Sequence, residues 1–490
     1  MRNYLEALGT LCLEWSGDGS LTVAGAAADS RAVRPGWLFC AIPGAREDGT
    51  KYIPDALARG AVGIVAERPV DLPPGIASVL VTDAYAAAGR IAELAAGKPA
   101  GHLRVLGITG TNGKTTCAYL LRHMLRAAGR APAMVGTVEY DLCGEVLPAD
   151  RTTPTPFELQ ELLARAQGHG AQDLVIEVSS HALAQRRLGC MAVAGALFTN
   201  LTGDHLDYHH TFPEYYAAKR LLFTELLAPG APAVINLEDE YGERLHAELT
   251  AEGRVRPLGV GKDQQADVRL AKIKTGLHGI EFSLLLPDAT LHLSSPLIGR
   301  HNVTNLAQAA TLAWTIGLPL ETIARAAGEC IGAPGRLQAI PAPAGFVTYV
   351  DYAHTDDALK NVLRALRQLK PKRLLLVFGC GGDRDRTKRP RMGREAAQGA
   401  DLIFVTSDNP RSENPEAILD DIEAGIPRSR QHVRLADRRA AIRAAIAAAQ
   451  PGDVVLVAGK GHEDYQEIKG VKYPFDDVLE VRAAIAERGI

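Results

Sequence analysis

The residues best suited to chemistry stand at positions 107–116, in the run Gly-Ile-Thr-Gly-Thr-Asn-Gly-Lys-Thr-Thr. An apolar, strand-like run precedes them, and an amphipathic, helix-like run follows at 117–128. Strand, glycine loop, lysine, hydroxyl and helix form the layout of a phosphate cradle. In such a cradle, backbone N–H groups bind phosphate oxygens and the lysine adds charge. Thr115 can reach a magnesium ion, so the pattern predicts a phosphate site at residues 110–116.

This loop departs from the common pattern at one position. The usual form has a glycine five residues before Gly113, where this chain has Ile108. The loop is therefore a shortened variant, Gly110-Thr-Asn-Gly-Lys-Thr. A glycine turn with a chance lysine is the alternative, and the flanking strand and helix argue against it.

A carboxylate stands near the end of the next strand-like run, 173–178, in Glu177-Val-Ser-Ser-His. A carboxylate at a strand's carboxyl end, in the same sheet as the phosphate loop, is well placed to hold magnesium on a nucleotide. A capping or solvated glutamate is the alternative. Ser179 with His181 could resemble a nucleophile pair, but the chain lacks the Gly-x-Ser-x-Gly turn that such a serine needs.

Polar residues gather again at 200–210, after another buried strand. They favour a second metal or phosphate contact, with His205 as the first choice. No cysteine partner or His-Glu-x-x-His spacing supports zinc. In the helix that follows, the residues alone predict that Lys219 is a solvated lysine on an amphipathic surface.

Length and composition limit the class of protein. A chain of 490 residues suggests three domains, and 47% hydrophobic with 23% charged residues is ordinary for a globular protein. A net charge of −3 gives no argument for nucleic acid or an anionic membrane. There is no membrane-spanning run and no signal peptide. Seven scattered cysteines fit a reducing cytosol better than a disulfide framework.

Alternating strand and helix patterns predict an α/β protein of three domains. Residues 1–98 form a small mixed domain with strands at 37–42, 61–66 and 78–82, and breaker-rich 97–101 connects it to the next. Residues 99–333 form a parallel sheet covered by helices, with an antiparallel appendage at 267–299. Residues 334–490 form a second, doubly wound sheet with strands at 346–350, 373–378, 402–406 and 454–458.

The unusual residues of the third domain follow its strands. Ligands of such sheets bind at the carboxyl ends of the strands. The residues expected there are Asp351, His354, Gly381-Gly-Asp-Arg384, Asp408-Asn-Pro-Arg411 and Gly459-Lys-Gly-His-Glu463.

Taken together and in order, these motifs resemble the Mur ligase family of ATP-dependent amide-forming enzymes. The resemblance also covers Ala218-Lys-Arg-x-Leu-Phe, His301-Asn-x-x-Asn and Gly335-Arg. Within the family, Asp29-Ser-Arg, Thr152-Thr-Pro and Asp408-Asn-Pro-Arg411 are similar to the branch that adds the third residue of the peptidoglycan stem, in the form that takes meso-2,6-diaminopimelate.

This resemblance implies an N-terminal domain for a UDP-sugar, a central ATPase and a C-terminal Rossmann-like domain for the amino acid. It implies a cytoplasmic enzyme of cell-wall synthesis, and we expect a monomer. Its small-molecule substrates would be ATP, UDP-N-acetylmuramoyl-L-alanyl-D-glutamate and diaminopimelate. It implies that Lys219 is carbamylated, which reverses the prediction from the residues alone.

The resemblance also assigns roles to individual residues. Catalytic residues would be Lys114, Glu177, His205 and Lys219, and magnesium ligands Thr115, Glu177, His205 and Lys219. Nucleotide contacts would be Gly110, Thr111, Asn112, Gly113, Lys114, Thr115, Thr116, Asn302, Arg336 and Asp351. UDP-sugar contacts would be Ser30, Thr152, Thr153, Ser179, Gln185 and Arg187. Amino-acid contacts would be Arg384, Asp408, Asn409, Pro410, Arg411, Gly459 and Glu463.

The amino acid can also be argued from charge. Diaminopimelate has a distal centre with both an ammonium and a carboxylate, whereas lysine ends in an ammonium alone. Arg384 and Arg411 can pair with carboxylates, and Glu463 can take an ammonium. In a desolvated pocket, a lysine substrate would leave one arginine unpaired. The site would then discriminate against lysine by a factor of about 10⁴.

Three alternatives stay open. One is a lysine-adding ligase of the same branch, against which Asp408-Asn-Pro-Arg411 argues. Another is a folylpolyglutamate-type ligase, against which Thr152-Thr-Pro and Asp29-Ser-Arg argue. The third is a non-catalytic nucleotide-binding protein, against which Lys114, Glu177, His205 and Lys219 argue.

Overall fold

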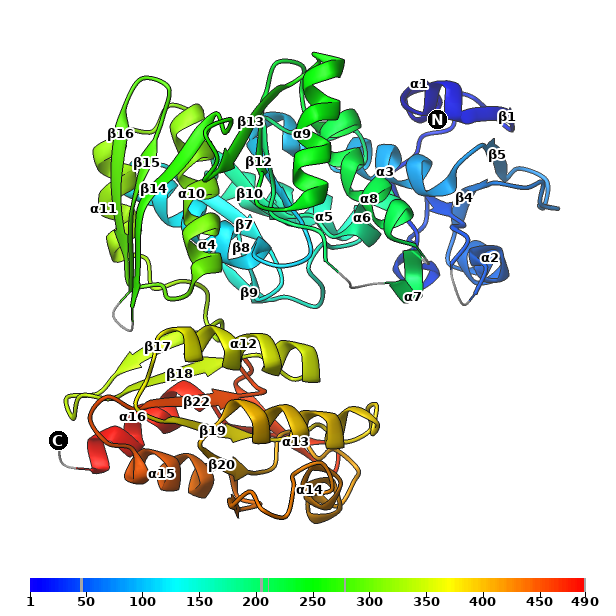
Figure 1. Ribbon diagram of the computed structural model, residues 1–490. Helices are drawn as coiled ribbons and strands as arrows, with labels where there is room; N and C mark the ends of the chain where they lie inside the picture. The colour runs from blue at the N-terminus through cyan, green and yellow to red at the C-terminus, as the bar shows by residue number, and fades with distance from the viewer. Residues whose placement is uncertain (45–46, 203–205, 210, 277–278, 489–490) are drawn as a thin grey trace. The chain divides into compact units, whose positions relative to one another are not determined.

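The computed structural model describes residues 1–44, 47–202, 206–209, 211–276 and 279–488 of the chain. They form two compact units, Met1–Arg269 with Ala307–Ile323 and Leu270–Leu306 with Ala324–Ile490 (Figure 1). Strands and helices alternate in both units, which confirms the predicted α/β class. No described helix is long and apolar enough to cross a bilayer. The domain boundaries after residues 98 and 333 stay predictions.

The first unit contains a five-stranded sheet made by the N-terminal residues. Its strands are β1 (Cys12–Ser16), β2 (Gly25–Ala27), β3 (Trp37–Cys40), β4 (Ala61–Ala66) and β5 (Ala77–Val81). They lie in the order β1-β5-β4-β3-β2, all parallel except β1. The strands predicted in this region are therefore confirmed. Helices α1 (Arg2–Leu8), α2 (Ile53–Ala58) and α3 (Ala84–Ala95) accompany the sheet, and α3 buries its alanine face in the core.

The other strands of this unit begin with the strand that precedes the phosphate loop. They are β6 (Arg104–Thr109), β7 (Pro132–Val135), β8 (Glu139–Asp141), β9 (Val146–Pro148), β10 (Asp173–Glu177), β11 (Gly195–Phe198), β12 (Pro232–Asn236) and β13 (Arg256–Gly261). Their order is β13-β12-β11-β6-β10-β7-β8-β9, parallel as far as β7. β6 thus lies between β10 and β11, with Glu177 opposite Ile108 and Phe198 opposite Thr109. The carboxyl ends of these three strands meet at one edge.

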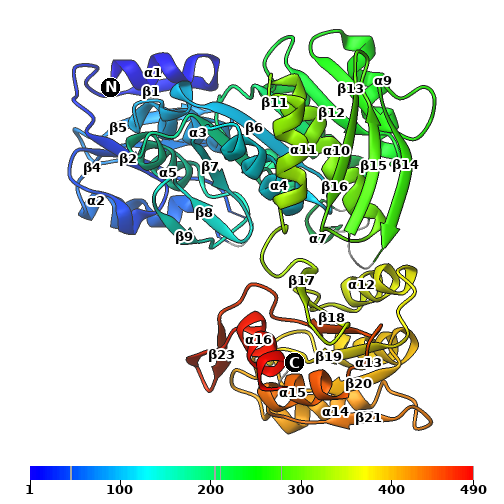
Figure 2. The same ribbon diagram turned by 90° about the vertical axis from the view of Figure 1, so that its left-hand side faces the viewer.

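Helices pack against these parallel strands, whose side chains are apolar on both faces, as a covered sheet requires. They include α4 (Lys114–Ala127), α5 (Pro156–Gly168), α6 (Ser180–Ala184), α8 (Phe212–Leu221) and α9 (Glu240–Glu252). Figure 2 shows α5 beside α3 of the N-terminal sheet. Polar caps fix where several of these helices begin: Asp83 begins α3, Ser179 begins α6 and Thr211 begins α8.

The predicted antiparallel appendage corresponds to β14 (Val268–Gly276), β15 (Gly279–Leu285) and β16 (Thr290–Ser295). β15 and β16 pair antiparallel from Ile280 opposite Ser295 to Leu285 opposite Thr290, as expected. β14 differs from the prediction, because its first residues run parallel to β13. Helix α10 (Arg300–Thr315) then begins where the sequence indicated a helix.

The second unit contains a six-stranded sheet. Its strands are β17 (Gln338–Pro341), β18 (Val347–Asp351), β19 (Leu374–Phe378), β20 (Leu402–Val405), β21 (His432–Arg434) and β22 (Val454–Ala458), in the order β17-β18-β22-β19-β20-β21. All pair parallel except β17. The doubly wound arrangement is confirmed by alternation along β19: Leu374, Leu376 and Phe378 face one core cluster, and Leu375 and Val377 face another.

Each of these two clusters is covered by its own helices. One contains residues of α12 (Asp356–Gln368), α13 (Lys388–Gly399) and α14 (Pro415–Glu423). The other contains residues of α15 (Arg438–Ala448) and α16 (Asp477–Glu487). A hairpin of β23 (Tyr465–Ile468) and β24 (Val471–Pro474) follows β22. The ends of β18, β19, β20 and β22 carry the residues that the sequence singled out.

Candidate active site

The phosphate loop joins β6 to α4, as predicted, with Lys114 as the first helical residue. Gly110 has a φ of 147°, and a Cβ there would lie 1.8 Å from Thr199 Oγ1, so only glycine fits. The loop is held from the end of β11. Asn112 N donates to Asn200 Oδ1 at 2.9 Å, and Asn200 Nδ2 donates back to Asn112 O at 3.0 Å. Polar residues after β11 therefore shape the loop.

Thr115 and Glu177 meet at the edge where β6 and β10 end. Thr115 Oγ1 donates to Glu177 Oε2 at 3.0 Å, and the Glu177 carboxylate is fully buried. Its other donors are Thr137 N at 2.9 Å and Thr137 Oγ1 at 3.0 Å. Magnesium is usually held by one or two carboxylates and hydroxyls together with substrate phosphates. A buried carboxylate beside a hydroxyl and the phosphate loop fits that ion.

Lys219 is 1% exposed, so the prediction of a solvated lysine from the residues alone is wrong. Its Nζ donates to Gly110 O at 2.8 Å and lies 4.5 Å from the centre of the Tyr215 ring. Lys114 Nζ donates to the same Gly110 oxygen at 2.9 Å. Two lysine side chains therefore converge on one carbonyl of the phosphate loop. The helix pattern missed this because the partner loop lies far away in sequence.

His205, predicted as a metal ligand, lies outside the described residues. The residues before it contact the phosphate loop. Thr202 N donates to Thr111 Oγ1 at 3.0 Å, and Tyr215 OH lies 3.1 Å from that hydroxyl. Thr202 is therefore held against the phosphate loop.

Four of the six residues expected to contact a UDP-sugar are connected to one another next to Glu177. Thr153 Oγ1 donates to Glu177 O at 2.8 Å and accepts from Ser179 N at 3.0 Å. Arg187 Nη1 donates to Thr153 O at 2.7 Å, and its Nη2 donates to Gln185 Oε1 at 2.7 Å. Burial and the nearby charge of Arg151 lower the pKa of Arg187.

The remaining two residues of that set are placed differently. Thr152 Oγ1 lies 3.1 Å from Thr137 Oγ1, which joins it to the Glu177 contacts. Ser30 is buried in the turn Ser30–Ala32 after β2, next to Asp55. It is the member of the set that belongs to the N-terminal sheet.

Sequence reasoning missed Thr137 and Tyr85. Thr137 is the second residue after β7, so the strand-end argument that found Glu177 would also have found it. Tyr85, on α3, donates to Pro43 O at 2.7 Å and interacts electrostatically with Tyr208 and Arg187. Burial, chiefly, raises its pKa, so it stays a neutral donor. No sequence motif marked it.

The backbone of α3 touches the loop that carries Arg187. A Cβ on Gly89 would lie 2.7 Å from Gly189 Cα and 2.9 Å from Arg186 O. Both atoms are backbone, so neither can move aside cheaply. We expect Gly89→Ala to lower the free energy of unfolding by about 1–3 kcal/mol, although alanine is the better helix former. Urea denaturation measures this.

The matched control for that substitution is Gly168→Ala. Gly168 ends helix α5, and a Cβ there would meet no atom within 4 Å. We expect this variant to keep or slightly increase the parent's stability. Equal stability of the two variants would contradict the close contact.

In the second unit, Asp351 ends β18 and holds the turn that carries Arg336. Its Oδ2 accepts from Leu337 N at 2.7 Å and its Oδ1 from Ala353 N at 2.8 Å. Burial raises the pKa of Asp351, opposed by the charge of Arg336. The Arg336 guanidinium lies 5.3 Å from the centre of the Tyr352 ring. These two predicted nucleotide contacts are therefore neighbours.

The turn of Arg336 also packs against the loop after β22. A Cβ on Gly335 would lie 2.2 Å from Gly461 C and His462 N, so the two backbones are in direct contact. Asn302, the third predicted nucleotide contact of this unit, lies on α10. Its Nδ2 donates to Ile298 O at 2.8 Å, and its Oδ1 accepts from Asn305 Nδ2 at 3.0 Å.

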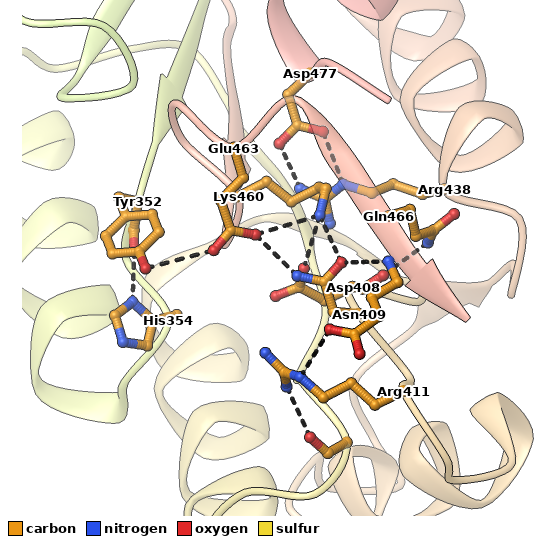
Figure 3. A network of polar contacts seen from close by, with 12 residues as sticks. Tyr352, His354, Asp408, Asn409, Arg411, Arg438, Lys460, Glu463, Gln466 and Asp477 are labelled. Atoms are coloured by element: carbon orange, nitrogen blue, oxygen red, sulfur yellow. Dashed lines mark hydrogen bonds and ion pairs between the residues drawn. The ribbon is translucent and has the colours of Figure 1, made fainter. Parts of the chain in front are cut away.

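The residues expected to bind the amino acid converge at the ends of β19, β20 and β22 (Figure 3). Asn409 Nδ2 donates to Glu463 Oε2 at 2.8 Å. A Cβ on Gly459, whose φ is 122°, would lie 3.2 Å from Asp408 Oδ2. A Cβ on Gly382 would lie 2.0 Å from Pro410 O. The three loops are thus packed together.

Arg384 and Arg411 approach the same turn, at Gly381. A Cβ on Gly381 would lie 3.0 Å from Arg411 Nη1 and 3.9 Å from Arg384 Cγ. Arg411 also donates to Gly382 O at 2.7 Å and pairs with Glu467 at 3.3 Å. Its backbone is left-handed, with a φ of 49°, and its N donates to Glu467 O at 3.0 Å.

These contacts correct the physical argument that we made from charge. Arg384 is exposed, and Arg411 has a carboxylate partner in the protein itself. A lysine substrate would therefore leave neither arginine buried and unpaired. We expect discrimination against lysine to be weaker than the 10⁴ argued from a desolvated pocket.

Comparison with known proteins covers nearly the whole chain. Family models match in three blocks: "Mur ligase family, catalytic domain" at 22–101, "Mur ligase middle domain" at 108–313 and "Mur ligase, glutamate ligase domain" at 335–461. The chain is 45% identical to the UDP-N-acetylmuramoyl-L-alanyl-D-glutamate--2,6-diaminopimelate ligase of Synechococcus elongatus, over 96% of this chain and 95% of the relative. It is 44% identical to the protein of the same name from Solibacter usitatus, over 95% and 94%.

Solved structures give the same similarity. A structure of a UDP-N-acetylmuramoyl-L-alanyl-D-glutamate--2,6-diaminopimelate ligase matches with a TM-score of 0.72 and 35% identity, over 96% of both chains. A MurF ligase from Thermotoga maritima, solved with ADP, matches with a TM-score of 0.56 and 19% identity, over 96% of this chain and 100% of that one. The second similarity concerns the fold alone.

Proposed function

This chain belongs to the Mur ligase family, whose three-domain fold it has, and we propose that it is the ligase that adds meso-2,6-diaminopimelate to UDP-N-acetylmuramoyl-L-alanyl-D-glutamate. The reaction consumes ATP and serves peptidoglycan precursor synthesis. The observation that carries the proposal is full-length similarity at 44–45% to ligases of that name. The packed Asp408, Asn409 and Glu463 add support, because they offer a ligand ammonium two carboxylates, one of which accepts from the Asn409 amide.

The first step activates a poor electrophile. The γ-phosphate of ATP passes to the substrate carboxylate, which gives an acyl phosphate and ADP. The loop amides at residues 110–113 and Lys114 bind the phosphates and offset their charge. Magnesium bound at Thr115 and Glu177 would supply further positive charge to the phosphate oxygens. Thr153, Gln185 and Arg187 orient the UDP-sugar end of the acceptor.

The second step forms the amide bond. The amine of diaminopimelate attacks the acyl carbon, the tetrahedral intermediate collapses, and phosphate leaves with the electrons of the broken C–O bond. The amine must lose one proton in this step. Glu463 holds the distal ammonium, Asn409 orients Glu463, and Arg384 and Arg411 face the distal carboxylate. Alignment of amine and acyl phosphate is the main contribution of these residues.

Lys219 is proposed to carry a carbamate. Burial disfavours a charged ammonium, and the neutral amine is the form that reacts with CO₂. A carbamate would place a carboxylate-like group, with one N–H left to donate to Gly110 O, beside Lys114 instead of a second cation. It would also give a second magnesium ion an oxygen ligand. We further propose that the enzyme acts in the cytoplasm as a monomer.

One assay tests the function. The purified chain is given ATP, magnesium and UDP-N-acetylmuramoyl-L-alanyl-D-glutamate, with meso-diaminopimelate or L-lysine in parallel reactions. We expect phosphate release and a tripeptide product, identified by mass, with diaminopimelate. A faster reaction with lysine would overturn the assignment of the amino acid. Absence of phosphate release with every amino acid tried would overturn the ligase itself.

A further inference from the structure

Lys460 is a fully buried lysine inside the proposed amino-acid site. Its Nζ lies 2.9 Å from Asn409 Oδ1, 3.4 Å from Asp408 Oδ1 and 3.5 Å from Glu463 Oε2 (Figure 3). One ammonium thus touches three residues that would bind the substrate. A lysine is rarely buried completely unless its charge is paired. The contacts account for the burial and suggest what the lysine does.

The first consequence concerns the orientation of the Asn409 amide. Its Oδ1 accepts from Lys460 Nζ and from Glu467 N, each at 2.9 Å. Only an oxygen can accept from two N–H donors, so the NH₂ group must point the other way. There it donates to Glu463 Oε2 at 2.8 Å. Lys460 therefore fixes Asn409, and both fix one oxygen of Glu463.

The second oxygen of Glu463 faces Tyr352, whose OH donates to Oε1 at 3.4 Å. Burial, with the charge of Glu463, raises the pKa of Tyr352 to about 12, so its hydroxyl keeps its proton. This hydrogen bond to Oε1 is longer than the 2.8 Å bond that Asn409 donates to Oε2, so Oε1 has the weaker partner. It is the one left to accept from a ligand ammonium.

The charges around Lys460 do not balance among the residues that the structure describes. The carboxylates are Asp408, Glu463 and Asp477, and the cations are Lys460 and Arg438. Arg438 and Asp477 form a fully buried pair at 2.6 Å. These five groups together carry one negative charge, which a single ligand ammonium would neutralise. The other charged or titratable groups nearby are the Arg411–Glu467 pair, Arg336 with Asp351 beside the Tyr352 ring, Lys472 on the Tyr465 ring, and His462. The rings of Tyr352 and Tyr465 are neutral.

We propose that Lys460 is a positioning residue for the amino-acid substrate: its buried ammonium holds Asp408, Asn409 and Glu463 in place and leaves them the charge that one substrate ammonium neutralises. This inference rests on the proposed function and deepens it. Lys460 does not touch the reacting atoms. It acts through the three side chains that face the substrate.

Lys460→Met tests the proposal, because methionine fills similar space without a charge. We expect the KM for diaminopimelate to rise by about 100-fold, since misplacing a binding group by about 1 Å has effects of that size. The KM values for ATP and the UDP-sugar substrate stay near those of the parent. Lys274→Met is the matched control, since Lys274 is an exposed lysine of strand β14 whose ion pair is with the exposed Glu281. A similar rise in all three KM values would mean a general structural role and would overturn the proposal.

The pH dependence of kcat/KM for diaminopimelate distinguishes the loss of the Lys460 charge from a change in side-chain shape. Without Lys460, Asp408 and Glu463 repel each other, so the pKa of one of them rises. A substrate ammonium needs the ionised form. The acid limb of kcat/KM for diaminopimelate therefore moves to higher pH in Lys460→Met. The double variant Lys460→Met/Asp408→Asn removes that repulsion, and its acid limb returns toward the parent's, whatever its absolute rate. An unmoved acid limb in Lys460→Met contradicts the proposal.

A measurement on the free protein distinguishes this inference from the proposed function. A carboxyl whose folded-state pKa is raised costs stability above its unfolded value, and the cost disappears as pH falls. The difference in Tm between parent and Lys460→Met should be larger at about pH 8 than at about pH 4.5. Failure of the parent to use diaminopimelate would reject the function alone. A Tm difference that does not change with pH would reject the charge role of Lys460 alone.

Discussion

Lys219→Ala loses ligase activity by about 10³-fold, and short carboxylic acids such as formate or acetate restore part of it. The alanine variant removes the carbamate that we propose on this side chain, together with the ligand it would offer to magnesium. A small carboxylate can enter the space left by the side chain and supply the missing oxygens. Steady-state phosphate release, with and without added acid, measures both effects.

The structure explains why the effect should be large. Lys219 is buried, and its Nζ and that of Lys114 donate to the same carbonyl oxygen of Gly110. Two ammonium groups this close repel each other, whereas a carbamate on one would attract the other. ¹³C NMR of protein equilibrated with labelled bicarbonate should show a carbamate signal that Lys219→Ala lacks.

Lys262→Ala serves as the control for that experiment. Lys262 forms an exposed pair with Glu238 at 2.7 Å, and such pairs contribute little. We expect it to keep the parent's activity and to be indifferent to added acid. Full activity in Lys219→Ala would reject the carbamate, as would rescue of the control by the same acids.

Arg411→Ala lowers kcat/KM for diaminopimelate by about 10²-fold and changes the KM for ATP by less than about twofold. Removing one partner of a partly desolvated charged contact typically costs about 3 kcal/mol, which corresponds to that factor. The loss is limited because Glu467 and Gly382 O already share the guanidinium with the ligand. Initial rates with each substrate varied in turn measure it.

Two further variants show whether the effect of Arg411→Ala comes from the lost charge or from the lost guanidinium geometry. Arg411→Lys keeps the charge but loses the planar fork, so we expect it to recover only part of the activity. Arg443→Ala removes an exposed arginine that pairs with Glu487, and should behave as the parent. If diaminopimelate kinetics were unchanged in Arg411→Ala, the assignment of Arg411 to the amino acid would be wrong.

Much of the site follows from where strands end. Glu177 follows an apolar run, as do Asp351 and Asp408, and parallel strands bring their carboxyl ends to one edge of a sheet. Local sequence is sufficient for this, because apolar periodicity identifies the strands and the polar residue after each is visible. The phosphate loop was found for the same reason, with glycines where a close backbone approach requires them.

What the sequence could not predict depends on contacts between distant segments. Lys219 has the spacing of a surface lysine, and it is buried because distant segments such as the loop at Gly110 lie against its helix. Arg411 was expected to face a substrate alone, but Glu467 of a later hairpin pairs with it. Lys460 stands in the motif Gly459-Lys-Gly-His-Glu463, but its glycine neighbours do not indicate from the sequence that its side chain is buried.

The contact between Gly335 and Gly461 has a thermodynamic consequence. The backbone that carries Arg336, a proposed nucleotide contact, cannot shift without displacing the loop that carries Glu463, since no side chain separates the two backbones. A nucleotide that draws Arg336 in would therefore alter the affinity for the amino acid. By linkage, the amino acid must alter nucleotide affinity by the same factor. The nucleotide and the amino acid would then bind cooperatively, and the Gly335–Gly461 backbone contact would carry the coupling free energy between the two sites.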